Sequence, residues 1–148
     1  GRAWAGTPAV MDYAEMAAHD SMLNPPATWS IYDAGLVFEW LHEQGGLAAM
    51  AAINADKAAQ LYACIDASDG FYHNPVEVAC RSQMNVPFFL ADSRLDADFL
   101  AGAEAAGLKY LKGHKSTGGM RASIYNAVPL EAVAALVAYM RAFAARHG

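Results

Sequence analysis

The sequence has few charged residues and no long apolar run, and each shortage excludes a class of protein. Charged residues make up 17% of the 148 residues and hydrophobic residues 55%, so the chain is not intrinsically disordered. Ten basic and fifteen acidic residues give a net charge of −5. This balance argues against a nucleic-acid-binding protein, which needs a surplus of Lys and Arg. No stretch of about 18 uninterrupted apolar residues predicts a membrane span.

Cysteine is also scarce. Cys64 and Cys80 are too few for a disulfide scaffold and are typical of a reducing compartment, so we expect a cytoplasmic protein. The histidines are too scattered to predict a zinc or other metal site; they are His19, His42, His73, His114 and His147. The chain begins at Gly1 with neither an initiator Met nor the apolar run of a signal peptide. We therefore expect it to be part of a longer chain.

Apolar residues at helical spacing predict two long helices in the first half of the chain. The first begins near Thr28 or Ser30 and ends before the glycine pair at 45–46, and the second covers residues 47–67. The first helix is apolar nearly all round, which is typical of a helix with more than one packing partner. No strand is predicted beside these helices, so we expect neither to have a sheet of its own chain to cover. Residues 1–27 are predicted to be irregular.

The second half alternates strand and helix patterns and predicts a small α/β layer. Its predicted elements are a strand over 84–90, a helix from a Ser93–Asp96 capping box to Gly107, strands over 108–112 and 120–125, and a helix that starts at Pro129. Pro87 lies inside the first of these strands, so that strand is predicted to lie at a sheet edge or to carry a bulge.

The most informative segment lies between the last two predicted strands. It places four basic side chains around a loop with three glycines; they are Lys112, His114, Lys115 and Arg121. Glycine lets the backbone approach a ligand, Arg offers a fork for a carboxylate, and Lys offers a point charge for a phosphate. A solvated hairpin loop is the alternative interpretation. Arg121 argues against it, because its apolar neighbours predict a buried strand and a buried guanidinium needs an anionic partner.

Two further polar segments have simple structural interpretations. Residues 21–28 could contact an anion before a helix, or Thr28 could be an ordinary N-cap. Residues 81–85 could be ordinary pairing at the end of a strand. No phosphate-binding P-loop or Gly-x-Ser-x-Gly motif is present. Lys57 and Lys109 lie in what we interpret as an ordinary helix and strand, with no pocket that would lower a lysine pKa.

Seven strings of residues together carry a resemblance to a known family. They are PAVMDY at 8–13, SMLN at 21–24, GLVFEWL at 35–41, RSQMNVPF at 81–88, KGH at 112–114, GGMRASIYNA at 118–127 and PLE at 129–131. Over almost its whole length the chain resembles the C-terminal portion of the phosphoserine aminotransferase family, whose members are pyridoxal-phosphate enzymes of aminotransferase fold type I. The resemblance implies an α/β fold: residues 1–45 would be the end of the large domain with an interdomain helix, and residues 46–148 the C-terminal small α/β domain. The two long helices would come from the large-domain and interdomain region.

The resemblance also implies an activity. Family members are homodimers that transfer an amino group between glutamate and 3-phosphohydroxypyruvate, a phosphorylated 2-oxo acid, in serine biosynthesis. They can also serve a 4-phosphohydroxythreonine step in vitamin B6 synthesis. The implied cofactor is pyridoxal 5'-phosphate. The family's Schiff-base lysine lies upstream of Gly1, so we expect no catalytic residue in this chain and no activity from the chain alone.

Site residues follow from the resemblance position by position. Asn24 and Pro25 fall where a loop reaches the cofactor phosphate of the other subunit, with Thr28 nearby. Arg121 falls where the family holds the substrate α-carboxylate. His114 and Lys115 fall where a His-Arg pair receives the distal anion.

Two departures from the family pattern concern this site. Pro25 replaces a Thr and therefore has no hydroxyl and no N–H to donate, and Lys115 replaces an Arg. The alternative function is a stand-alone anion-binding or regulatory α/β domain that uses the cationic loop.

Overall fold

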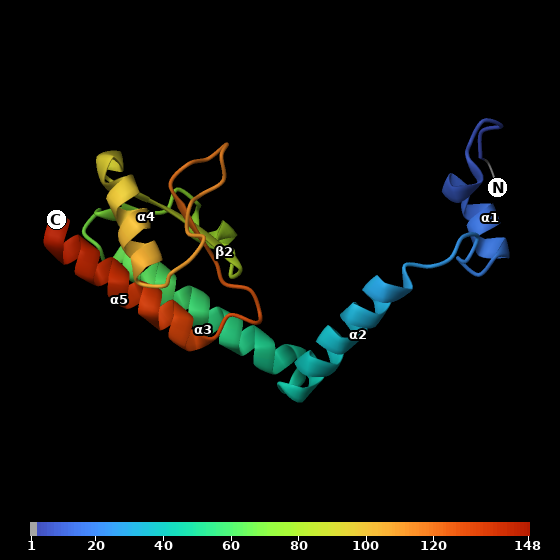
Figure 1. Ribbon diagram of the computed structural model, residues 1–148, viewed down its shortest axis with the longest axis horizontal. Coiled ribbons are helices and arrows are strands. Elements are labelled where there is room, and N and C mark those ends of the chain that lie inside the picture. The colour runs from blue at the N-terminus through green and yellow to red at the C-terminus, as the bar shows by residue number, and fades with distance from the viewer. Residues whose placement is uncertain (1–2) are drawn as a thin grey trace. The chain divides into compact units, whose positions relative to one another are not determined.

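The computed structural model describes residues 3–148, which divide into two compact units, one ending at Gln44 and the other spanning Gly45–Gly148 (Figure 1). The first unit contains a 3-10 turn, η1 (Ala9–Met11), and two helices, α1 (Tyr13–Ala18) and α2 (Thr28–Glu43). The prediction that residues 1–27 are irregular is therefore wrong for η1 and α1. Helix α1 forms because Asp12 caps it, accepting a hydrogen bond from the Ala14 amide at 2.9 Å.

Helix α2 agrees with its predicted bounds and stays uncovered within its own unit. It ends at Glu43, two residues before Gly45, whose φ of +95° is left-handed. Leu36 is 46% exposed and Val37 is 52% exposed. The alternative of Thr28 as an N-cap is wrong, because Ala27 holds that position and no side chain caps the helix. The apolar surface of α2 thus needs a partner outside its unit.

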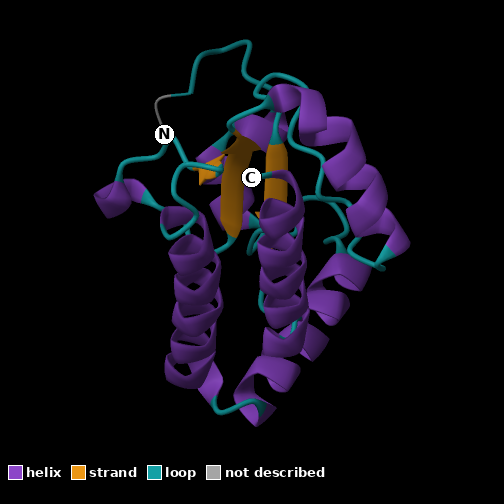
Figure 2. Cartoon of the chain, turned by 90° about the vertical axis from the view of Figure 1, so that its left-hand side faces the viewer, coloured by secondary structure: helices purple, strands orange, loops and turns teal. Residues whose placement is uncertain are grey.

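The second unit is an α/β arrangement, which confirms the predicted fold class. Its elements are α3 (Gly46–Asp66), β1 (Tyr72–His73), η2 (Val78–Cys80), β2 (Asn85–Leu90), η3 (Ser93–Leu95), α4 (Asp96–Ala105), β3 (Met120–Ser123) and α5 (Leu130–His147). The strands form one antiparallel sheet in the order β1-β2-β3. Figure 2 shows these strands in orange among the helices.

Three local predictions in this unit need correction. Residues 108–112 do not form a strand; only Lys112 bridges to Met120, and Tyr110 has a φ of +62° that breaks an extended run. Strand β1 was not predicted, because two residues are too short to show a period. The start of the 93–107 helix is capped by Asp92, which accepts from the Arg94 amide at 3.0 Å, and not by a Ser93 capping box.

Helix α3 was expected to have no sheet of its own chain to cover, and this is wrong. It packs against β1, β2 and α5, and Figure 1 shows α3 and α5 side by side. Ala58, Leu61 and Ile65 of α3 belong to the buried core. The spacing of these residues along one helical stripe explains why this face is buried.

Pro87 lies in the central strand and not at an edge, which corrects the sequence prediction. It stands opposite Arg121 of β3, and the Arg121 amide donates to the Leu111 carbonyl at 2.7 Å, on the other side of β3. The Pro87–Arg121 pair therefore exchanges no backbone hydrogen bond that would need an N–H from Pro87. On its other side, β1 has already ended at His73, and the Asn74 side chain donates to the Pro87 carbonyl. A proline fits here because no ladder bond is lost.

The two faces of the sheet have different surroundings. Alternate residues of β2 and β3 are buried against the helices; they are Val86, Phe88, Leu90, Met120 and Ala122. The other residues of these strands face away and are half-buried; we call this the open face, formed by Asn85, Pro87, Phe89, Arg121 and Ser123. No helix in residues 3–148 is long and apolar enough to cross a bilayer.

Phe99 of α4 occupies the centre of the buried face. Its ring centroid lies 5.8 Å from that of Phe88, 5.2 Å from that of Tyr139 and 5.1 Å from that of Phe143, all at steep interplanar angles. Such edge-to-face pairs add to the stabilisation that burial supplies. One side chain therefore joins α4, β2 and α5.

Replacing Phe99, which is 0% exposed, should destabilise this unit strongly. We expect Phe99→Ala to lower the free energy of unfolding by about 3–5 kcal/mol, because it removes the ring and leaves a cavity. Urea unfolding of the protein measures this loss. Tyr110→Ala is the control: Tyr110 is 90% exposed, so its removal should change stability by less than about 0.5 kcal/mol. Equal losses in both variants would contradict this description of the core.

Candidate functional site

Arg121 lies on the open face of the sheet, in the middle of β3. Its side-chain Nε is buried and has no hydrogen-bond partner among the described residues. No described carboxylate forms an ion pair with it. A buried guanidinium nitrogen without an acceptor is unfavourable. The Arg121 guanidinium is therefore suited to bind an anion that comes from outside the unit.

The loop that precedes β3 is closed at its base by glycines. The Gly113 amide donates to the Gly119 carbonyl at 2.8 Å. A Cβ on Gly113 would stand 1.9 Å from the Gly118 carbonyl oxygen, and a Cβ on Gly119 would stand 2.5 Å from the Phe89 ring. Only glycine allows the two sides to approach this closely. The loop at 114–118, which we call the anion loop, is thereby held one residue from β3.

His114 and Lys115 are exposed at the start of the anion loop. The His114 carbonyl accepts from the Thr117 amide at 2.9 Å and from the Gly118 amide at 2.8 Å, which folds the loop into a turn. The His114 Nδ1 lies 2.7 Å from the Ser116 hydroxyl oxygen and 3.3 Å from the Ser116 amide nitrogen, so Nε2 is the ring nitrogen that the loop leaves for a ligand. His114 can therefore donate one hydrogen bond from Nε2, and the Lys115 ammonium adds a charge.

A polar cluster on the open face lies beside Arg121. The Ser123 hydroxyl donates to the Asn85 side-chain oxygen at 3.0 Å, and the Asn85 side-chain nitrogen donates to the Tyr125 hydroxyl at 3.1 Å. The sequence prediction missed this cluster, although the alternation of Arg121, Ser123 and Tyr125 in a strand pattern could have placed them on one face.

The predicted cofactor residues lie in the first unit. Asn24, Pro25 and Thr28 are exposed. Thr28 is the first residue of α2, and its amide donates to the Pro26 carbonyl at 2.7 Å. The following amides at this helix start have no side-chain cap, and such groups together with the Thr28 hydroxyl can bind a phosphate.

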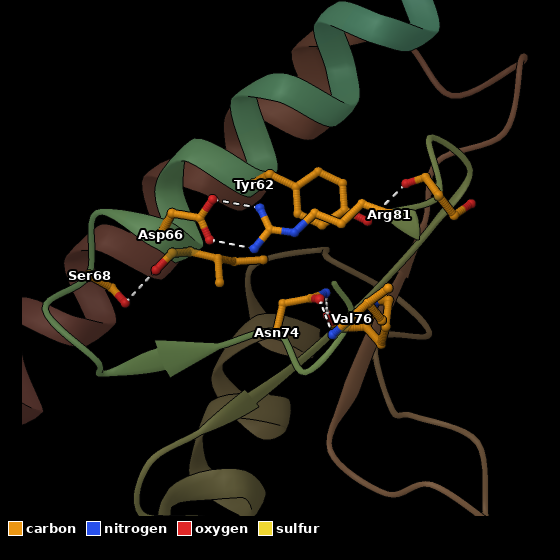
Figure 3. Close-up of polar contacts among 9 residues, drawn as sticks. Tyr62, Asp66, Ser68, Asn74, Val76 and Arg81 are labelled. Atoms are coloured by element: carbon orange, nitrogen blue, oxygen red, sulfur yellow. Dashed lines mark hydrogen bonds and ion pairs between the residues drawn. The ribbon is translucent and has the colours of Figure 1, made fainter. Parts of the chain in front are cut away.

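Within the 81–85 segment, Asn85 pairs with Ser123 in the sheet, and Arg81 makes a structural contact with α3. Arg81 forms two hydrogen bonds with Asp66, at 2.6 Å and 2.8 Å, and its guanidinium lies 4.6 Å from the centre of the Tyr62 ring (Figure 3). The Arg81 hydrogen bond holds the pKa of Asp66 below its usual range. This arginine ties the approach to β2 onto α3.

The interpretation of Lys57 as an ordinary helix residue is wrong. Lys57 is 0% exposed, and burial lowers the pKa of its amine. Its Nζ donates to the carbonyls of Ile124, Tyr125 and Val128, at 3.1, 2.8 and 3.0 Å. Lys109 is exposed, bonded to Glu104 at 2.6 Å, and not in a strand. Within residues 3–148, no three His, Cys, Asp or Glu side chains gather as metal ligands.

Comparisons with known proteins agree on one family. The aminotransferase class-V family profile matches residues 5–136. The phosphoserine aminotransferase of Aromatoleum aromaticum is 62% identical over 142 residues, which are 96% of this chain and 38% of that protein.

Solved structures give the same result. That of the phosphoserine aminotransferase from Bacillus circulans subsp. alkalophilus has a TM-score of 0.89 at 42% identity and covers 96% of this chain and 39% of its own. The pyridoxal-phosphate-bound enzyme from Trichomonas vaginalis has a TM-score of 0.83 at 43% identity, over 93% of this chain and 39% of its own. The chain spans about 40% of the length of such relatives.

Gly118 and Gly119, at the base of the anion loop, should differ in how much stability is lost when each is replaced by alanine. Gly118 has a φ of +76° but no atom within 4 Å of a built Cβ, whereas Gly119 has a φ of +58° and meets Phe89. Gly118→Ala should cost about 1–2 kcal/mol of backbone strain. Gly119→Ala should cost about 1–3 kcal/mol more, because its methyl group also overpacks the Phe89 ring. Urea unfolding of both variants measures the difference, and equal losses would contradict the close approach at Gly119.

The contact between Asp66 and Arg81 should make stability depend on pH. Because the folded pKa of Asp66 is lowered, its contribution is present above the ordinary value of 3.8 and is lost as the pH falls through the folded pKa. Asp66→Asn should cost at most about 1 kcal/mol at neutral pH, since the carboxylate is 51% exposed. The loss should vanish in acid. Unfolding of Asp66→Asn and of the unchanged protein, measured at neutral and at acidic pH, checks this. A loss of stability that does not vary with pH would contradict it.

Proposed function

The chain belongs to the aminotransferase class-V family, and we propose that the protein that contains it is a phosphoserine aminotransferase using pyridoxal 5'-phosphate. The observation that carries this proposal is the buried, unpartnered Nε of Arg121 on the open face of the sheet, beside the anion loop. Such a site is suited to small-molecule substrates with two anionic ends. The relatives at about 60% identity support the same assignment.

We propose glutamate and 3-phosphohydroxypyruvate as the substrates, in serine biosynthesis, and 4-phosphohydroxythreonine as a further one, in vitamin B6 synthesis. Each has a carboxylate near the carbon that reacts and a second anionic group at its far end. One site can therefore accept a dicarboxylate and a phosphate if its distal contacts tolerate both geometries. The Lys115 ammonium, as a point charge, has that tolerance.

In this mechanism Arg121 binds the α-carboxylate through two parallel hydrogen bonds. The planar guanidinium matches the carboxylate in shape, and the partly buried position strengthens each bond. Fixing one end of the substrate at β3 orients the carbon that carries the amino group. His114 then donates from Nε2 to the distal anion, and Lys115 neutralises its charge.

The cofactor contact would come from the start of α2. Thr28 and the uncapped amides of the first turn fit a phosphate group, and Asn24 can add an amide donor. Pro25 can donate nothing there. When bound, pyridoxal phosphate would supply an aldehyde carbon that takes up the amino group in exchange for its oxygen, and a ring that accepts electrons.

We further propose that the chain alone does not catalyse transamination. The family's Schiff-base lysine falls upstream of Gly1, and Lys57, the buried lysine in residues 3–148, already donates to three carbonyls. We assign residues 1–45 to the end of the large domain and the interdomain helix, and 46–148 to the small domain. A homodimer would cover Leu36, Val37 and Phe38 of α2, which are exposed here. The cytoplasmic location stays a prediction from the low cysteine content.

The direct test is an assay of the full-length protein with glutamate and 3-phosphohydroxypyruvate. We expect transamination that requires pyridoxal phosphate, and none from residues 1–148 alone. Absence of activity in the loaded full-length protein would overturn the proposal. The mass of the native gene product distinguishes this enzyme from the alternative function. A native product of 148 residues would support a stand-alone anion-binding domain.

Two variants of the full-length enzyme should distinguish the contacts made at the two ends of the substrate. Arg121→Lys should weaken every amino-acid substrate alike, by about 1.5–3 kcal/mol or roughly 10–100-fold, because it loses a charged hydrogen bond. Lys115→Ala should penalise phosphorylated substrates more than unphosphorylated ones. Steady-state kcat/KM values for both substrate types measure these effects. Unchanged kcat/KM values for phosphorylated substrates in the Lys115 variant would show that the distal anion is held elsewhere.

A further inference from the structure

Lys57 is an unusual residue in this fold. It is one of the largest side chains buried in the core of the second unit, although lysine is almost never fully buried unless it is paired. No described carboxylate forms an ion pair with it. Its position is therefore explained only by the groups that its Nζ does contact.

Those groups are three backbone carbonyls from one short segment. The Nζ lies 3.1 Å from the oxygen of Ile124, 2.8 Å from that of Tyr125 and 3.0 Å from that of Val128. An ammonium group has three N–H donors and a neutral amine has two. The three acceptors thus match the charged form and leave no proton of the ammonium without a partner.

The segment that Lys57 holds is the connection from β3 to α5. Ile124 directly follows β3, and Arg121 lies three residues before it. Asn54 is one helical turn from Lys57, so both side chains project from the same side of α3. The Asn54 side-chain nitrogen donates to the Asn126 side-chain oxygen at 2.8 Å. On the other side, the Ile124 amide donates to the Met84 carbonyl at 2.8 Å.

We propose that Lys57 is a positioning residue for Arg121: it fixes the end of β3 so that the guanidinium is held ready for a substrate carboxylate. This inference rests on the proposed function, because it assumes that Arg121 binds that carboxylate. A binding fork must be held within about 0.5 Å of its productive position, and a displacement of 1 Å can cost about 100-fold. Lys57 meets no ligand itself; its effect passes through the backbone at 121–124.

An apolar residue of similar length removes the anchor but keeps most of the volume. In Lys57→Met the carbonyls of Ile124, Tyr125 and Val128 lose their donor inside the core, so the segment must shift toward water or other donors. We expect the affinity of the full-length holoenzyme for glutarate to fall about tenfold. Glutarate has the two carboxylates of glutamate and no amino group, so calorimetry measures its binding without turnover.

Kinetics and hydrogen exchange provide the matching readouts. The KM for glutamate should rise by a similar factor while kcat changes little, the pattern of lost substrate binding. Exchange of the Arg121 and Ile124 amides, which are bonded to Leu111 and Met84, should become faster in Lys57→Met.

The matched control is Leu61→Ala. Leu61 lies one turn further along α3 and is also 0% exposed, but none of the polar bonds to the 124–128 segment comes from it. This variant should lose stability and still bind glutarate with the wild-type affinity at temperatures where it is folded. A parallel loss of affinity in both variants would show that Lys57 acts only through general stability, and would overturn the proposal.

A second variant covers the case in which Lys57→Met does not fold. Lys57→Ala removes three carbons and the nitrogen, which are the heavy atoms of propylamine, and leaves a buried cavity that can admit a small ligand. Prepared with propylamine, it should regain glutarate affinity; propanol, which has a single donor, should not restore it. Equal rescue by both compounds, or no rescue of the folded variant, would contradict the role of the ammonium.

The outcomes distinguish this inference from the proposed function. Unchanged glutarate affinity in folded Lys57→Met overturns the positioning role, whether or not exchange at β3 increases. A wild-type enzyme that binds glutarate through Arg121 but transfers no amino group overturns the proposed function alone. Selective loss of affinity in Lys57→Met, with faster exchange of the Arg121 and Ile124 amides, supports the positioning role.

Discussion

The pairing of β2 with β3 is the constraint on which the candidate site depends. Its register sets Arg121 opposite Pro87 and Met120 opposite Phe88. Because side chains alternate along a strand, this register directs Arg121 to the open face and Met120 into the core. A slip of one residue would exchange these faces and bury the guanidinium among aromatic rings. The aromatic contacts of Phe99 with Phe88 oppose such a slip, since they need Phe88 on the helix side.

Buried polar groups then hold the ends of these strands. Arg81 fastens the approach to β2 onto α3 through Asp66, and Lys57 fastens the exit of β3 onto the same helix. Apolar packing can hold a sheet against helices, but it is not directional. Hydrogen bonds from fixed donors give the connecting segments a defined position. The unit thus combines a packed core with polar anchors at the points where the chain enters and leaves the sheet.

The sequence predicted the long elements well, because their periods are strong. Helices α2 and α3 and strand β2 lie within one or two residues of their predicted bounds, and the string around Arg121 led to the family that the comparisons show. It could not predict β1, which has two residues, or the interruption at Tyr110, which depends on a left-handed φ. It also missed Lys57, because a lysine in an alanine-rich helix has no local signal of burial. Its acceptors lie more than sixty residues away in the sequence.

We propose that Arg121 and the anion loop hold opposite ends of one substrate. A crystal structure of the full-length protein with phosphoserine bound tests this most directly. We expect two parallel hydrogen bonds from the Arg121 guanidinium to the α-carboxylate, with the phosphate against His114 Nε2 and the Lys115 ammonium. A phosphate on Arg121, or a ligand carboxylate bound away from the open face, would contradict it.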